Sequence, residues 1–178
     1  MTRCGGCLKV RRALIHKTPK RIAAPLARLL LPAVIPSDAV VREARSWLGV
    51  PFRHQGRDRN GIDCVGLPIV ILQSLGALPA DFKEPTNYPP FPHLDQLKPL
   101  IHQYCTPLSD EPRPGALITL AQHQTLSHVA IYSDRNTLIH AYGREPHLAV
   151  IEHGYRGLWR TRFTSRVWAL PGVSYEPA

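Results

Sequence analysis

The chain has 178 residues, of which 44% are hydrophobic and 20% charged, and its formal net charge is +9. This length is enough for one domain with a real core and argues against two domains, and the composition is that of an ordinary globular protein. The 18 prolines predict many turns and short elements.

The positive charge is concentrated at the start of the chain. Eight of the 22 Lys and Arg residues lie in residues 1–37, which contain no Asp or Glu, so residues 38–178 carry the other 14 against 13 acidic side chains. A nearly neutral body offers no basic groove for phosphate. We therefore expect no nucleic-acid binding by the core, and we assign any attraction to anionic surfaces to the basic tail.

Residues 1–36 are predicted to be a disordered basic extension. Their apolar part is interrupted by Pro25, Arg28 and Pro32, unlike a secretory signal, and no run approaches the roughly 20 apolar residues of a membrane-spanning helix. We expect no integral membrane segment and synthesis in the cytoplasm without a signal peptide. A membrane-surface helix and an upstream start codon are the alternative explanations.

Four cysteines occur in the chain. Cys4 and Cys7 form the sequence CGGC, but a single CxxC without a second pair or a nearby strand is weak evidence for a zinc or redox site. Cys64 and Cys105 lack the spacing of a disulfide framework, and a reducing cytosol would keep both as thiols.

The folded part is predicted to begin with a helix over residues 38–48. Its apolar residues recur on one helical face, Ser37 is a suitable N-cap, and Gly49 ends the pattern. A polar loop with two glycines follows and leads to Asp63.

A second helix is predicted over residues 64–75. This segment is apolar nearly all round, as expected for a buried central helix, and Asp63 is its expected N-cap. Pro68 has no N–H to donate to the carbonyl of Cys64, so the first turn should be tight or kinked beside the thiol.

The pattern changes from helices to strands after residue 115. A short helix over 93–104, interrupted by Pro99, comes first. Five strands follow, separated by polar or Gly/Pro turns, at 116–121, 127–133, 137–142, 148–153 and 166–170. Helices followed by a strand meander predict an α+β fold in which an antiparallel sheet packs on the central helix. The domain is expected over 37–172, with 173–178 as a C-terminal tail.

Cys64 occupies the predicted first turn of the central helix. Unpaired backbone N–H groups and the positive end of the helix dipole would lower the pKa of a thiol there and favour the thiolate. The same N–H groups could hold an oxyanion when the sulfur attacks a carbonyl. This position predicts a nucleophile, provided that a base lies nearby.

His128 and His140 are the candidate base and its orienting partner. If the hairpin between their strands centres on Asp134, the two histidines are cross-strand neighbours on one face. His128 could then accept the thiol proton while His140 holds its ring in the useful tautomer. One cysteine and two histidines could equally form a zinc site, and all three could be structural residues, so spacing alone leaves these alternatives open.

The segment AVVREARSWLGVPFRHQGRDRNGIDCVGL, followed by SHVAIYSD and TLIHAY, resembles the NlpC-type family of papain-like cysteine peptidases. The resemblance covers about residues 37–172 and is greatest to the phage-tail branch of the family. In that family the cysteine of the DC-GL turn is the nucleophile, the histidine of the H-(V/G)-(A/G)-IY strand is the general base, and a polar residue on the next strand orients it. These positions fall on Cys64, His128 and His140.

The resemblance implies a papain-like α+β fold and cleavage of peptide stems in peptidoglycan, commonly between γ-D-glutamate and a diamino acid. The reaction would use an acyl-enzyme, with no metal or cofactor. The phage-tail branch implies a location in the virion tail, tail-tip proteins as partners, and action on the cell wall when DNA is injected, or a role in tail assembly.

Several residues depart from the family pattern. Phe52 replaces a frequent tyrosine, Val65 a frequent serine, and Ala116 the aspartate of a PGD sequence, while Pro68 is unusual inside the helix. These departures allow a slower or altered site, so a structural tail component with a degenerate site is the alternative function.

The oxyanion is expected to be held by the backbone N–H groups of residues 64 and 65. Phe52 has no hydroxyl to assist them. His54 or Gln55, from the loop before the nucleophile, would supply the missing donor.

Overall fold

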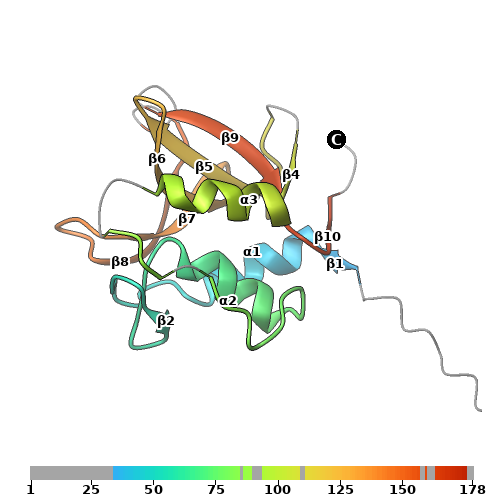
Figure 1. Ribbon diagram of the computed structural model, residues 1–178, viewed down its shortest axis with the longest axis horizontal. Helices are drawn as coiled ribbons and strands as arrows, with labels where there is room; N and C mark the ends of the chain where they lie inside the picture. The colour runs from blue at the N-terminus through green and yellow to red at the C-terminus, as the bar shows by residue number, and fades with distance from the viewer. Residues whose placement is uncertain are drawn as a thin grey trace, which may run out of the picture. The chain divides into compact units, whose positions relative to one another are not determined.

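The computed structural model describes residues 34–84, 86–89, 94–108, 111–156, 159 and 163–175. Nearly all of the basic extension, including its CGGC pair, lies outside these residues. The helices of the described part are α1 (Ser37–Arg45), α2 (Gly66–Ser74), the short 3₁₀ helix η1 (Asp95–Leu97) and α3 (Lys98–Tyr104). Figure 1 shows α1 and α2 next to each other, and α3 packs against the same face of the sheet as α2, since both helices line one apolar cavity.

A six-stranded antiparallel sheet makes up the second half of the domain. Its spatial order is β4-β9-β5-β6-β7-β8, so consecutive hairpins build most of it. The strands are β4 (Thr106–Pro107), β5 (Leu117–Gln122), β6 (Thr125–Tyr132), β7 (Thr137–Tyr142), β8 (Ala149–Gly154) and β9 (Thr164–Ala169). All five predicted strands are present with ends within two residues, because alternating apolar residues marked them in the sequence.

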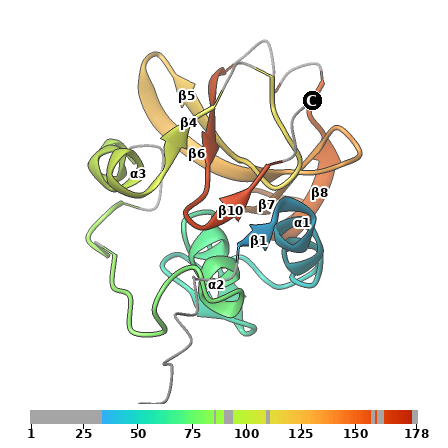
Figure 2. The same ribbon diagram turned by 90° about the vertical axis from the view of Figure 1, so that its right-hand side faces the viewer.

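Two pairs of short strands were not predicted. Near the two ends of the described chain, β1 (Ile35–Pro36) pairs in parallel with β10 (Val173–Ser174), and Figure 2 shows this pair beside α1. These strands lie just outside the predicted domain limits of 37 and 172. The other pair, β2 (Arg57–Asp58) and β3 (Gly61–Ile62), forms a small hairpin immediately before the nucleophile candidate.

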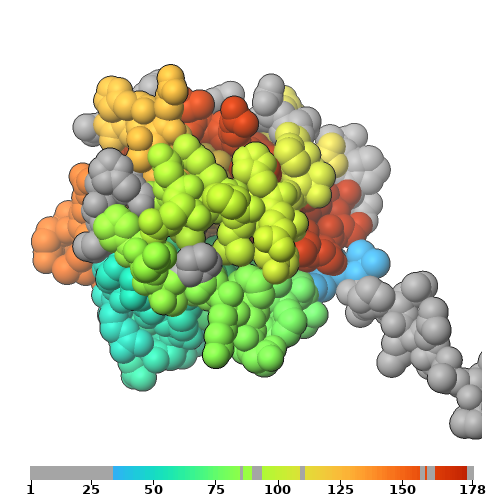
Figure 3. All heavy atoms as spheres, in the orientation of Figure 1, coloured from blue at the N-terminus to red at the C-terminus, as the bar shows by residue number. Residues whose placement is uncertain are grey.

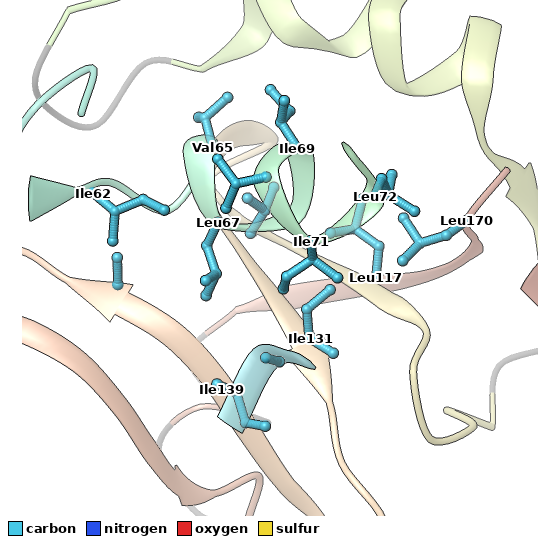
Figure 4. Packing of buried hydrophobic residues seen from close by; sticks show 14 of the residues in the cluster. Ile62, Val65, Leu67, Ile69, Ile71, Leu72, Leu117, Ile131, Ile139 and Leu170 are labelled. Atoms are coloured by element: carbon cyan, nitrogen blue, oxygen red, sulfur yellow. The ribbon is translucent and has the colours of Figure 1, made fainter. Parts of the chain in front are cut away.

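The main core lies between the helices and one face of the sheet. Every residue from Gly66 to Leu72 is buried, which confirms that α2 is a central helix with no polar face. Figure 4 shows α2 side chains such as Ile71 directed toward Leu117 and Ile131 of the sheet. The opposite face carries a second cluster built from Ala116, Ile118, Leu120, Ala130, Leu138, Tyr155 and Val167.

The ends of the helices differ in detail from the sequence predictions. Ser37 is the first residue of α1 rather than its cap, and α1 ends at Arg45, with turns continuing to Gly49 at φ +84°. The helix α2 begins at Gly66 rather than at residue 64. Because Pro68 has no N–H, the carbonyl of Cys64 receives no helical hydrogen bond and the helical ladder is interrupted there.

The described domain therefore has the predicted α+β architecture, with helices before an antiparallel sheet. The helix α3 lies on the surface seen in Figure 3. In the described ranges, none of the helices has both the length and the apolar character that crossing a bilayer requires.

Candidate active site

Asp63 anchors the turn that carries Cys64. Its Oδ1 accepts a hydrogen bond from the Gly66 N–H at 2.7 Å, and its backbone carbonyl accepts one from the Leu67 N–H at 3.1 Å. These contacts are typical of an N-cap, but α2 begins at Gly66 with Val65 as its N-cap residue, so Asp63 stabilises the turn that leads into the helix and is not its cap. The flanking residues Ile62 and Val65 are buried in the core (Figure 4), so the thiol is held on a rigid turn.

The Asp63 carboxylate is also the centre of a buried charged cluster. Besides the Gly66 N–H, it accepts the Gln55 N–H at 2.7 Å, Nη1 of Arg57 at 2.9 Å and the hydroxyl of Tyr88 at 2.7 Å. Arg57 in turn donates to the Tyr88 oxygen at 2.6 Å. These contacts tie the Cys64 turn to the hairpin before it and to a segment 25 residues further along the chain.

The two histidines lie on adjacent strands, but their register differs from the prediction. Ile131 pairs with Ile139 and Tyr132 with Leu138, so the hairpin centres on Arg135 instead of Asp134. The predicted direct opposition of His128 and His140 was therefore wrong, and the two are diagonal neighbours. Diagonal neighbours share a face and remain within reach of long side chains.

A β-bulge precedes His128 on β6. Leu120 pairs with His128 and Ala121 with Leu126, which leaves Ser127 as an extra residue opposite the β5 strand. The Ser127 hydroxyl donates to the Leu120 carbonyl at 3.0 Å. Bulges bend a strand and redirect the next side chain, and this one lies beside the candidate base.

The predicted contact between the imidazoles is present. Nε2 of His128 lies 2.6 Å from Nδ1 of His140, and the exposed fractions of the two residues are 7% and 0%. His153, on β8, extends the contact: its Nε2 lies 2.6 Å from Nε2 of His140. Sequence reasoning missed His153, although it ends the predicted strand 148–153, which was expected next to the strand of His140.

Cys64 and His128 line one small cavity with a volume of about 20 Å³, which is room for roughly one water molecule. Phe52, His54 and Tyr88 are also in its wall. The Gln55 side chain is directed elsewhere, since its Nε2 donates to the carbonyls of Thr86 and Tyr88. Of the two loop donors suggested by the sequence, the structure brings only His54 to the thiol.

The electrostatics of the thiol oppose the sequence prediction. Burial and the negative charge of Asp63 raise the pKa of Cys64 to about 12, although the backbone of Val129 and of Cys64 itself favour the thiolate. Burial also lowers the pKa of His128 to about 4 and the pKa of His140 well below its ordinary value. The predicted lowering of the Cys64 pKa was wrong, because desolvation and the adjacent carboxylate outweigh the helix dipole. The resting pair is a neutral thiol and a neutral imidazole.

The geometry does not favour the alternative of a zinc site. Two histidine nitrogens on one tetrahedral zinc would lie roughly 3.3 Å apart, whereas those of His128 and His140 face each other at 2.6 Å as donor and acceptor. Among the residues that the structure describes, no group of three or more His, Cys, Asp or Glu side chains is arranged to hold a metal ion.

A cysteine at the start of a central helix, packed on an antiparallel sheet that carries a chain of histidines, is the architecture of the papain-like class. The family model described as "NlpC/P60 family" matches residues 49–167. The chain belongs to the NlpC/P60 family, as the sequence motifs predicted, and its fold is the papain-like α+β fold of that family.

One solved structure supports the same fold, and two further ones match with TM-scores below 0.5. A NlpC/P60 family protein from Bacillus cereus ATCC 10987 is 19% identical with a TM-score of 0.55; the match covers 73% of this chain and 39% of that one. The NlpC/p60 domain of the peptidoglycan hydrolase SagA is 19% identical, with a TM-score of 0.49 and coverage of 74% and 97%. RipD from Mycobacterium tuberculosis, described as a non-catalytic NlpC/p60 domain protein, is 17% identical, with a TM-score of 0.48 and coverage of 74% and 94%. No curated protein sequence matched the chain.

Proposed function

We propose that the protein is a cysteine peptidase that hydrolyses peptide stems of peptidoglycan. One observation carries the proposal: Cys64 and His128 line the same cavity, while the other ring nitrogen of His128 is occupied by His140. A base with one nitrogen directed to its orienting partner and one left for the thiol is the arrangement that nucleophilic catalysis needs. Family membership supports the same class of reaction.

In the proposed reaction, the Cys64 sulfur attacks the amide carbonyl while its proton moves to Nδ1 of His128. The imidazolium then gives this proton to the leaving amine, and a thioester to the stem peptide remains. Water attacks the thioester with His128 as base, which releases the acid and restores the thiol. Because Asp63 and its carbonyl engage the N–H groups of Gly66 and Leu67, those of Cys64 and Val65 are the first-turn donors proposed for the oxyanion.

The neutral resting pair requires proton transfer to accompany attack on the carbonyl. Substrate in the cavity would supply the carbonyl and displace water, so the charge develops only where donors can stabilise it. The bond proposed is the one between γ-D-glutamate and a diamino acid, which the family resemblance supports. The proposed setting is a phage tail acting on the cell wall, with tail-tip proteins as partners, and this rests on the motifs alone.

The test is muropeptide release from purified peptidoglycan, followed by mass spectrometry. Wild type is expected to release fragments with new termini at the γ-D-glutamyl bond, and Cys64→Ala is expected to release none above background. Cys105→Ala is the matched control, since Cys105 is also a partly buried thiol but lines an apolar cavity beside α3. Equal release by wild type and Cys64→Ala would refute the proposal.

A second candidate is a non-catalytic wall-binding or structural component. The raised pKa of Cys64 and the small cavity favour it. It predicts that wild type sediments with peptidoglycan but releases no muropeptides, and that Cys64→Ala sediments equally well. The same digestion experiment therefore separates the two candidates.

A further inference from the structure

The third histidine, His153, gives the imidazole chain a direction. Nδ1 of His153 lies 3.0 Å from the carbonyl oxygen of Gly154, and a carbonyl can only accept a hydrogen bond. Nδ1 of His153 therefore carries the proton. In a neutral ring, Nε2 of His153 must then be an acceptor.

This acceptor determines the protonation of the other two rings. His140 donates from Nε2 to His153, so Nδ1 of neutral His140 is an acceptor. His128 must then donate from Nε2 to that nitrogen. The remaining nitrogen of His128, Nδ1, has no proton and is the one available to a thiol.

We infer that His153 is a positioning residue that sets the tautomers of His140 and His128 and so keeps Nδ1 of His128 unprotonated. This inference deepens the proposed function, on which its catalytic consequence rests. The carbonyl of Gly154 is the last acceptor in a line of hydrogen bonds that His128, His140 and His153 donate in turn. Any group at position 153 that can only donate would reverse this line.

The surroundings of the chain support a fixed arrangement. The rings of His140 and His153 lie 5.2 Å and 4.7 Å from that of Trp159, centre to centre, and the tilted indole contacts both. His140 is fully buried, so water does not compete for its nitrogens. Burial lowers the pKa of all three histidines, which keeps the rings neutral near pH 7.

His153 is the member of the chain that solvent can reach. It borders an open hollow of about 370 Å³ with Tyr142 of β7, His147 of the preceding loop, Glu152 of its own strand and Trp159. The Glu152 carboxylate is held by Arg45 at 2.9 Å and by Thr137 at 2.6 Å. The titratable group in hydrogen-bond contact with His153 is therefore His140. At the other end of the chain, the charges of Asp63 and Arg144 act on the pKa of His128.

Protonation of His153 would reverse the chain without moving any ring. Nε2 of His140 passes its proton to Nε2 of His153, Nδ1 of His140 takes the proton from Nε2 of His128, and Nδ1 of His128 takes up the added proton from solvent. His153 is then the doubly protonated ring, and Nδ1 of His128 carries a proton and cannot accept one from Cys64. Activity should fall on the acid side as His153 takes up a proton, below the ordinary pKa of histidine.

The experiment compares two variants of the full chain, His153→Gln and His153→Lys. Gln offers a carbonyl oxygen that accepts from His140, and we expect kcat/KM for muropeptide release within about threefold of wild type. Lys can only donate, and we expect a loss of about 10²–10⁴-fold in kcat with little change in KM, as for removal of general-base catalysis. Urea unfolding verifies that both variants fold.

Nitrogen-15 shifts of the histidine rings provide a readout that is independent of turnover. Wild type and His153→Gln should show His128 protonated on Nε2, whereas His153→Lys and acidified wild type should show it protonated on Nδ1. Wild-type His128 protonated on Nδ1 near pH 7, or equal losses in Gln and Lys variants, would overturn the inference. If wild type releases no muropeptides, the proposed function fails while the shifts still decide the tautomers.

Discussion

Two polar clusters lie near Cys64 and differ in charge: one consists of ionised side chains and the other of neutral imidazoles. On the helix side, Asp63 and Arg57 are charged, and the hydrogen bonds of Asp63 reach two other segments of the chain, residues 55–57 and Tyr88. On the sheet side, His128, His140 and His153 are neutral and bonded end to end. The charged cluster holds the backbone of the Cys64 turn in place. The neutral imidazoles can relay a proton from ring to ring without keeping a net charge buried.

The difference follows from the cost of charge in a protein interior. A buried carboxylate is tolerated only with several donors around it, and once satisfied it is expensive to disturb. An imidazole loses its proton instead of staying charged when it is buried. The candidate nucleophile is therefore held in place by a cluster of paired charges and lies beside a chain of imidazoles whose burial keeps them neutral.

The largest effect should come from breaking the charged cluster. Asp63→Ala removes the acceptor of the Gly66 N–H and one of the two carboxylates, Asp63 and Glu84, that Arg57 contacts, and we expect the free energy of unfolding to fall by about 3–5 kcal/mol. Asp58→Ala is the control, because Asp58 pairs with Arg53 at 3.0 Å on the exposed surface, where water and salt screen the pair and its loss should change the free energy of unfolding far less. Urea unfolding measures both. Equal losses would mean that the Asp63 cluster is no more than a surface ion pair.

The histidine chain should make the protein sensitive to mild acid. The pKa of His128 is about 4 in the folded protein and about 6.5 in an unfolded chain. Between these values only the unfolded state binds the proton, so the free energy of unfolding falls as pH falls from 6.5 to 4. The loss is about 3 kcal/mol for this group, and His140 and His153 act in the same direction.

This acid effect can be assigned by substitution. His128→Gln should flatten the dependence of unfolding free energy on pH between 6.5 and 4. Glu152, whose pKa is lowered to about 2 by Arg45, contributes its own loss at lower pH, below about 4.5. A slope in the histidine window that is unchanged in His128→Gln would show that His128 is not buried in its neutral form.

A smaller effect is expected from Tyr88→Phe. The change deletes the hydroxyl shared by Asp63 and Arg57 but keeps the ring in place, so the loss should be about 1–3 kcal/mol. Muropeptide release should fall little once the variant is folded, because the hydroxyl supports the turn and not the proton transfer. A loss of activity as large as that of Cys64→Ala would assign the hydroxyl to the reaction itself.

Local patterns in the sequence predicted most of the fold and three residues of the candidate site, Cys64, His128 and His140. The predicted hairpin centre was one residue too early, which shifts each cross-strand partner by two residues, for a physical reason. Asn136 adopts a left-handed conformation at φ +55°, and the Ser133 N–H donates to the Thr137 carbonyl at 2.9 Å. The loop is therefore the three residues 134–136, with the left-handed residue last, a common hairpin type that shifts the pairing.

The remaining errors concern interactions between distant parts of the chain. The Tyr88 hydroxyl donates a hydrogen bond to Asp63, 25 residues earlier in the chain. The periodicity of apolar residues does not predict such a contact. The pKa of Cys64 was predicted from its helix position alone, whereas burial and Asp63 determine it. His153 was predictable in principle, since a histidine at the end of the strand after TLIHAY would face His140 if β7 and β8 paired.

The central claim is that Cys64 rests as a thiol and loses its proton only during attack on substrate. The most direct test is the rate of iodoacetamide alkylation of the Cys64 peptide as a function of pH, measured by mass spectrometry on the free protein. We predict a rate at pH 7 no higher than that of a free thiol, rising only above pH 9, while muropeptide release is already high near pH 7. A rise in the alkylation rate with a midpoint below pH 7 would show a resting thiolate and contradict this account.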